Sequence, residues 1–273
     1  MPLLRTMWRS HEPPLGGRFL VSSVSSTDAG STLLRASVND AYAKHSLEGW
    51  IFSQVRVVDG MSVLDIGCGG GKQLLYLASR VSPDTRLLGI DASAGAIESV
   101  RARTAHLPNI DARQMSIDDC TNLLANERFD LIVSTYAIYY ASDMPAVLSG
   151  LRKLLKEGGA IFVCGPGAGT NRELIDLVNA CALDSTDRLE PIADFIDDRS
   201  VHSVSLSYAR TAVSRLENPV NFPSADATIA WWRSHASYRP ALEGPVRQAI
   251  EAAVEGDGHF TLSKAVLGVR FDA

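Results

Sequence analysis

The sequence has few features of a metal-binding or disulfide-bonded protein. Its four cysteines form no C-x-x-C pair, and no histidine cluster accompanies them at the spacing of zinc ligands. We therefore predict no metal site and expect four free thiols, as in a reducing cytoplasm. The N-terminus carries no continuous apolar stretch of the secretory type, which also favours a cytoplasmic location.

The chain also lacks an excess of positive charge and a long hydrophobic run. Lysine and arginine total 26 against 31 aspartates and glutamates, and the net charge is -5. Nucleic-acid-binding proteins usually carry a basic surface, so no nucleic-acid partner is predicted. No uninterrupted run reaches the roughly 18 apolar residues of a membrane helix, so no membrane partner is predicted either.

Hydrophobic spacing divides the chain into segments. Residues 1–30 are rich in serine, glycine and proline and predict a flexible extension, followed by a single domain over 31–273. Apolar residues recur at helical spacing over 31–58, which predicts N-terminal helices that form a lid. A helical insertion or cap is predicted over 166–205, and a final strand over 260–271.

Strand and helix patterns alternate from Ser62 to about residue 165. Repeated βα units of this length favour a parallel sheet with helices on both faces. The predicted fold class is α/β, a Rossmann-like doubly wound and mostly parallel sheet, with the N-terminal helices and the helical insertion added to it.

A glycine-rich loop after the first strand is the most informative motif. Residues 63–72 read VLDIGCGGGK. A P-loop is excluded because Ile66 stands where its first glycine is required. The dinucleotide fingerprint G-x-G-x-x-G fails at Lys72, which stands in place of its third glycine. Asp91 ends the next strand, and a carboxylate there can accept the hydroxyls of a ribose. Together these features predict a nucleoside-binding site.

Four motifs together resemble the class I S-adenosylmethionine-dependent methyltransferases. The first is the glycine loop, and the others are GIDAS at 89–93, FDLIVS at 129–134 and LRKLLKEGG at 151–159. In the last motif, Glu157 replaces the usual proline of the family. The resemblance covers residues 31–165 and implies a seven-stranded sheet.

The resemblance also implies which residues bind the cofactor, S-adenosylmethionine, and its product, S-adenosylhomocysteine. Asp65 and the glycine loop would surround the methionine end, Asp91 would hold the ribose, and residues 115–119 would lie near the adenine. The predicted cofactor-binding residues are Asp65, Gly67, Gly69, Gly71, Asp91, Ala92, Ser116, Ile117, Asp118 and Ser134.

The acceptor of the methyl group is predicted to lie among aromatic residues. Three tyrosines follow the fourth strand within 136–140, and aromatic rings can contact a cationic methyl group. The predicted catalytic residues are Tyr136, Tyr139 and His45. The predicted substrate-binding residues are Tyr42, Tyr139, Tyr140, Asn171, Trp232 and His235.

The predicted function is methyl transfer to a small molecule, in secondary metabolism. N- or O-methylation is favoured and C-methylation stays open. Two alternatives remain from the sequence: an NAD-dependent oxidoreductase, which the lysine at the third-glycine position disfavours, and a non-catalytic nucleoside-binding protein of the same fold.

Overall fold

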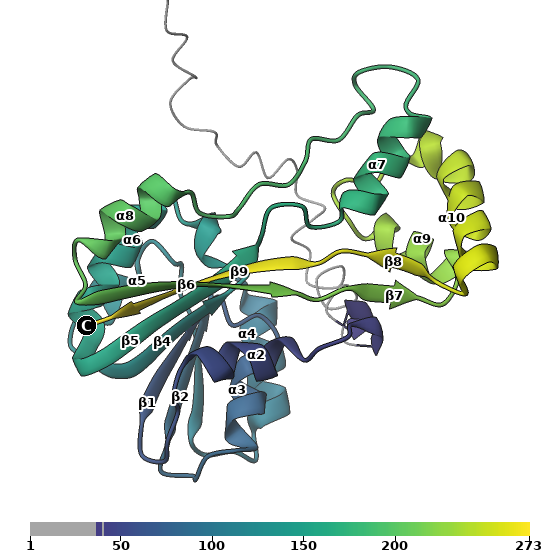
Figure 1. The fold of residues 1–273 in the computed structure, drawn as a ribbon. Helices are drawn as coiled ribbons and strands as arrows, with labels where there is room; N and C mark the ends of the chain where they lie inside the picture. The colour runs from purple at the N-terminus through teal and green to yellow at the C-terminus, as the bar shows by residue number, and fades with distance from the viewer. Residues whose placement is uncertain (1–36, 40) are drawn as a thin grey trace, which may run out of the picture.

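A computed structural model describes residues 37–39 and 41–273 of the chain. The predicted extension over residues 1–30 lies outside the described residues. Seven strands form one sheet in the order β3-β2-β1-β4-β5-β9-β6. Figure 1 shows this sheet with a smaller lobe beside it. The predicted α/β class, with a mostly parallel seven-stranded sheet, is confirmed.

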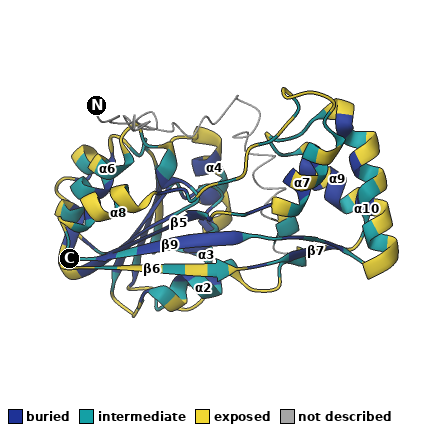
Figure 2. Cartoon of the chain, turned by 45° about the horizontal axis from the view of Figure 1, so that its top comes forward, coloured by how far each residue is buried: buried dark blue, intermediate teal, exposed yellow. Residues whose placement is uncertain are grey.

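Five parallel strands form most of the sheet. An antiparallel pair forms one of its edges. The parallel strands are β1 (Ser62–Ile66), β2 (Arg86–Asp91), β3 (Ile110–Gln114), β4 (Phe129–Thr135) and β5 (Leu155–Pro166). The antiparallel strands are β6 (Arg210–Glu217) and β9 (Ala265–Asp272). The inner strands are buried and β6 is largely exposed along its length, as Figure 2 shows.

Helices cover both faces of the sheet, as a doubly wound fold requires. One face carries α2 (Leu47–Gln54), α3 (Lys72–Ala78) and α4 (Ala94–Thr104). The other carries α5 (Cys120–Leu123), α6 (Met144–Leu151) and α8 (Asp198–Ser205), with short 3-10 helices η2 (Ile138–Tyr140) and η3 (Arg152–Leu154). Residues at alternate strand positions fill the two cores, because successive side chains of a strand point to opposite faces.

The small lobe has a hydrophobic core of its own. It consists of α7 (Arg172–Cys181), β7 (Val220–Phe222), α9 (Ala225–Arg233), η4 (Pro240–Leu242), α10 (Glu243–Asp257) and β8 (Phe260–Leu262). In the sequence, β7 and β8 lie between β6 and β9. Most of the lobe is therefore an insertion between these two strands of the main sheet (Figure 1).

The lobe differs from the insertion predicted over 166–205. That segment holds α7 and α8, but only α7 packs in the lobe, while α8 packs on α6 against the sheet. The final strand predicted over 260–271 is two strands, β8 and β9, separated by Ser263 and Lys264. Within the predicted lid segment, α2 packs directly on the sheet, with the Trp50 ring 5.8 Å from that of Phe162.

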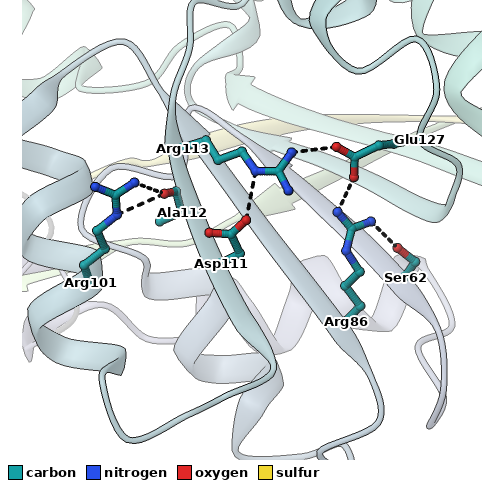
Figure 3. Close-up of polar contacts among 7 residues, drawn as sticks. All are labelled: Ser62, Arg86, Arg101, Asp111, Ala112, Arg113 and Glu127. Carbon is teal, nitrogen blue, oxygen red and sulfur yellow. Dashed lines mark hydrogen bonds and ion pairs between the residues drawn. The ribbon is translucent and has the colours of Figure 1, made fainter.

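A polar network links residues of β1, β2 and β3 with Glu127 (Figure 3). Glu127, just before β4, accepts hydrogen bonds from Arg86 and, at 2.6 Å, from Arg113. Arg113 also pairs with Asp111 at 2.8 Å, and Arg86 donates to the Ser62 hydroxyl at 3.3 Å. Burial raises the pKa of Glu127, but its two arginines outweigh that effect and lower it overall. The two arginines of the network therefore compensate the charges of its two carboxylates.

Candidate functional site

The glycine loop adopts a backbone that only glycine accommodates easily. Gly67 and Gly71 have φ of +71° and +77°, in the left-handed region. A Cβ on Gly67 would lie 2.2 Å from the Cβ of Ala137, so the loop touches the segment after β4. The amides of Gly67 and Cys68 donate to the carbonyl of Ile90 at 2.8 and 2.9 Å. The loop is thus held at the carboxyl ends of β1, β2 and β4.

Asp91 bridges the glycine loop and the turn that follows β2. Its Oδ2 accepts from the amide of Gly69 and its Oδ1 from the amide of Ser93, both at 2.9 Å. A carboxylate oxygen has a second lone pair, so each can still accept a ribose hydroxyl. The next residue, Ala92, is exposed at this edge, and its carbonyl accepts from the Gln114 side chain at 3.1 Å. The geometry fits the predicted ribose site.

Asp65 is a buried carboxylate that has no hydrogen-bond partner among the residues that the structure describes. The residue is 1% exposed, and neither Oδ1 nor Oδ2 receives a hydrogen bond from residues 37–39 or 41–273. Burial, and after it the negative charge of Asp91, raises the pKa of Asp65 to about 7. An isolated buried charge is costly, so such a group is suited to a cationic ligand. The ammonium of the methionine moiety of S-adenosylmethionine is a cation of the required kind, and the residues present therefore fit this cofactor.

The polar side chains predicted to lie near the adenine form hydrogen bonds with other residues of this protein. The Ser116 hydroxyl donates to Asp119 at 2.6 Å, and both oxygens of Asp118 accept from Ser142 at 2.9 and 2.7 Å. Ile117 packs against the hydrophobic core of the α6 face. The two polar side chains thus shape the loop after β3, and Ile117 offers apolar surface there.

Ser134 and Tyr136 shape the end of β4. The Ser134 hydroxyl is buried and donates to the Ile66 carbonyl at 2.9 Å, which fastens β4 to the start of the glycine loop. Tyr136 has φ of +55°, and its amide donates to the carbonyl of Cys164 at 2.8 Å. A left-handed conformation is costly for tyrosine, and such strain is concentrated at functional sites.

The aromatic residues of η2 form a cluster beside the end of β5. The rings of Tyr139 and Tyr140 are 4.8 Å apart, and Tyr139 lies 6.0 Å from Phe195. Burial raises the pKa of Tyr136 and of Tyr139 above the ordinary tyrosine value. Both phenols are therefore neutral near pH 7, which suits a role in orientation by hydrogen bonding and not as a phenolate base. Tyr140 is 49% exposed and borders the cluster.

His45 and Tyr42 precede α2. The main chain of His45 pairs with the Asn218 side chain at 2.8 and 2.9 Å, and its imidazole is exposed. The Tyr42 ring lies 5.8 Å from Phe222 of the small lobe. Both residues thus connect the N-terminal segment to the lobe.

Three other predicted substrate-binding residues make contacts within the lobe. Asn171, with φ of +60°, begins α7, and its amide donates to the Ser263 carbonyl at 2.7 Å. Trp232 is fully buried, and its indole N–H donates to Ser237 at 3.2 Å. The His235 ring lies 5.1 Å from Trp231. Trp232 is a core residue of the lobe, because neither its ring nor its N–H is left exposed for an acceptor.

Two charged residues beside the loop are missing from the predicted set. Glu48 of α2 is buried and pairs with Lys72 of α3 at 2.7 Å. The spacing of the apolar residues of α2 contains a signal for Glu48. It stands three and seven residues before Ile51 and Val55, within the apolar stripe of a helix, where a carboxylate is unusual.

The part of the chain that the structure describes contains no group of three or more metal-ligating side chains and no helix able to span a membrane. The candidate site brings together backbone amides, carboxylates and aromatic rings at the carboxyl edge of the sheet. Ligands of open α/β folds bind at this edge.

Comparison with known proteins identifies the family of the domain. The model of a methyltransferase domain matches residues 58–193, which include the glycine loop and the ends of β2 and β4. The trans-aconitate 2-methyltransferase of Deinococcus radiodurans is 30% identical over 199 residues, covering 67% of this chain and 72% of that protein.

More distant relatives match shorter segments or the fold alone. The demethylmenaquinone methyltransferase of Symbiobacterium thermophilum is 29% identical over 132 residues, 47% of this chain and 52% of that protein. The chain spans 42 to 52% of the length of two of the curated relatives that it matches.

Among solved structures, the YcgJ protein of Bacillus subtilis has a TM-score of 0.54 at 16% identity, with 82% of this chain and 97% of that chain covered, which shows the shared fold. Together with the identity and coverage of the Deinococcus relative, the family model decides the classification. The chain belongs to the class I S-adenosylmethionine-dependent methyltransferases.

Proposed function

We propose that the protein transfers the methyl group of S-adenosylmethionine to a small-molecule acceptor. The observation that carries the proposal is the unpartnered, buried carboxylate of Asp65 beside a glycine loop that Asp91 holds in place. A non-catalytic nucleoside-binding protein would need the ribose site, but it would not need a buried anion for a methionine ammonium. An NAD-dependent oxidoreductase is disfavoured for the same reason.

When bound, the cofactor supplies an electrophilic methyl group on a positively charged sulfur. Asp65 and the loop amides would hold its methionine end, and Asp91 its ribose. The chemistry that the cofactor would supply is in-line transfer of the methyl group to the acceptor atom, with the electron pair of the carbon–sulfur bond left on sulfur. Positioning of this kind can supply much of the rate acceleration.

We place the acceptor beside the aromatic cluster of Tyr139, Tyr140 and Phe195. The cluster offers apolar ring faces and neutral phenol hydroxyls, which favours an uncharged or partly aromatic small molecule. N- or O-methylation remains our preference, and the ring faces would also suit the cationic character of a C-methylation. A place in secondary metabolism stays a prediction from the sequence.

The test is an assay with radiolabelled S-adenosylmethionine and a panel of small acceptors that includes carboxylic acids, phenols and amines. We expect labelled product from at least one class. Tyr139→Phe should raise the acceptor KM several-fold while S-adenosylhomocysteine binding is unchanged. Tight binding of NAD without binding of S-adenosylhomocysteine would refute the proposal.

A further inference from the structure

The glycine loop contains a tight turn, residues 68–71, in which three glycines follow Cys68. The amide of Gly71 donates to the carbonyl of Cys68 at 2.8 Å, which closes the turn. Gly69 has φ of +50°, and a Cβ on it would have no atom of the described residues within 4 Å. Because glycine has more conformational freedom than any other residue, we expect such a turn to need restraint from neighbouring elements.

One restraint comes from Asp91, in the connection between β2 and α4. Its Oδ2 accepts from the amide of Gly69, and its Oδ1 accepts from the amide of Ser93, both at 2.9 Å. Ser93 is the N-cap of α4, and its hydroxyl accepts from the amide of Ala96 at 3.3 Å. One carboxylate therefore links the turn to the beginning of α4.

A second restraint comes from Arg103, in the last turn of α4. Its Nη1 donates to the carbonyl of Gly70. The helix also lies close to the turn, since a Cβ on Gly71 would be 3.0 Å from a methyl group of Val100. A hydrogen bond from a guanidinium is charge-assisted and stronger than one between neutral groups. The turn is therefore held at two successive residues, at the amide of Gly69 and at the carbonyl of Gly70.

We propose that Arg103 is a positioning residue for the cofactor, which keeps the turn at 68–71 in its binding conformation before S-adenosylmethionine arrives. A site that is already ordered in the free protein loses less conformational entropy on binding, so its affinity is higher. Arg103 acts through the carbonyl of Gly70 and need not touch the cofactor. The inference rests on the proposed function, because it assigns Arg103 a task in the same cofactor site.

Arg101 provides a matched control. It lies in the same last turn of α4 and is exposed, as Arg103 is. Its Nε and Nη2 donate to the carbonyl of Ala112 in β3 at 3.1 and 2.7 Å (Figure 3). Both arginines also place the same charge near the negative end of the helix dipole. They differ in the backbone carbonyl that they bind, which belongs to the glycine loop in one case and to a strand in the other.

The test measures binding of S-adenosylhomocysteine by titration calorimetry to wild type, Arg103→Met and Arg101→Met. Loss of the charge-assisted hydrogen bond to Gly70 should weaken binding by about tenfold. Arg101→Met removes the same charge from the same helix turn but leaves the loop restrained, so it should bind within about twofold of wild type. Thermal unfolding of the three ligand-free proteins checks that each is folded.

Hydrogen exchange of the Gly71 amide, followed by NMR, gives a second and local readout. This amide closes the turn, so its exchange reports how often the turn opens. In the ligand-free protein it should be several-fold faster in Arg103→Met than in wild type, and unchanged in Arg101→Met. Saturating S-adenosylhomocysteine should reduce the difference, because the ligand then holds the turn.

The remaining outcomes separate the inference from the proposed function. Wild-type affinity in Arg103→Met, or wild-type exchange of its Gly71 amide, would show that the turn is ordered without the arginine. Equal weakening by Arg101→Met would assign the effect to the charge of the helix and not to the contact with Gly70. Each of these results overturns the inference alone. If wild type itself failed to bind S-adenosylhomocysteine, the proposed function would fail and the inference with it.

Discussion

Two carboxylates at opposite ends of the same sheet have opposite surroundings. Glu127, at the amino-terminal end, accepts from two arginines, and its pKa is lowered. Asp65, at the carboxyl end, is more deeply buried, has no hydrogen-bond partner in the described part of the chain, and has a pKa raised to about 7. The fold neutralises the first charge with its own side chains, whereas the second is compensated only when a cation binds. Unpaired charge therefore marks the functional end of this sheet.

Among these substitutions, Asp65→Asn should weaken ligand binding most. Removal of one partner from a buried ion pair costs about 3 kcal/mol or more, so S-adenosylhomocysteine should bind about 100-fold more weakly. The ligand-free variant should melt at the same temperature as wild type or higher, because a buried unpaired charge has gone. Calorimetric titration and thermal unfolding check both. Undiminished binding would disprove the role of Asp65.

Gly67→Ala should be the next most damaging change. The new Cβ meets Ala137 at 2.2 Å in a backbone with φ of +71°, so the loop must move and binding should weaken by more than tenfold. Gly158→Ala is the matched control, with the same φ of +71° but no atom within 4 Å. Each variant should lose roughly 1 kcal/mol from its left-handed backbone, and Gly67→Ala more. Equal binding by the two variants would contradict the close approach.

Cofactor affinity should depend on pH through Asp65. Its pKa of about 7 in the free protein means that protons compete with the ligand below pH 7. Affinity for S-adenosylhomocysteine should therefore fall about tenfold for each pH unit below 7, and level off above it. Titrations from pH 5.5 to 8.5 measure this slope. A flat profile would mean that Asp65 is not the group that the ligand meets.

Glu127→Gln should have the smallest effect and act on stability alone. The partly exposed ion pairs of Glu127 with Arg86 and Arg113 contribute about 1 kcal/mol. The free energy of unfolding measured in urea should therefore fall by that amount, while the affinity for S-adenosylhomocysteine is unchanged.

The two acids should also have opposite effects on stability as pH changes. Because the pKa of Glu127 is lowered by folding, its contribution is present above the unfolded value of 4.5 and is lost as pH falls. The raised pKa of Asp65 makes its contribution fall as pH rises from about 4 to 7. Unfolding measured against pH for both variants separates these slopes.

The sequence predicts the parallel part of the sheet well, because its signals are local. The glycine loop, Asp65 and Asp91 each stand at the end of a predicted strand, and parallel strands bring their carboxyl ends to one edge. Short apolar runs likewise predict strands over 62–66, 86–90 and 129–134, each within one residue of β1, β2 or β4.

The small lobe and the acceptor side are not predictable in the same way. Trp232 and Tyr140 belong to similar aromatic groups in the sequence, yet one is fully buried in the lobe and the other is 49% exposed. Pairing over long separations decides this difference, as when β7 joins β8 across the intervening helices. Glu48 interrupts the apolar spacing of its helix, but its partner Lys72 is distant in sequence and adjacent only after folding.

The placement of the lobe has a consequence for protein engineering. Glu217 and Ala265 are direct partners in the β6-β9 ladder, so the chain leaves the sheet and returns to it at a single pair of residues. A short turn could join this pair at little cost in loop-closure entropy and delete residues 218–264, which include most of the lobe. Such an excised chain would keep every strand of the main sheet. The lobe is in this sense a module that could be removed or replaced without breaking the main sheet.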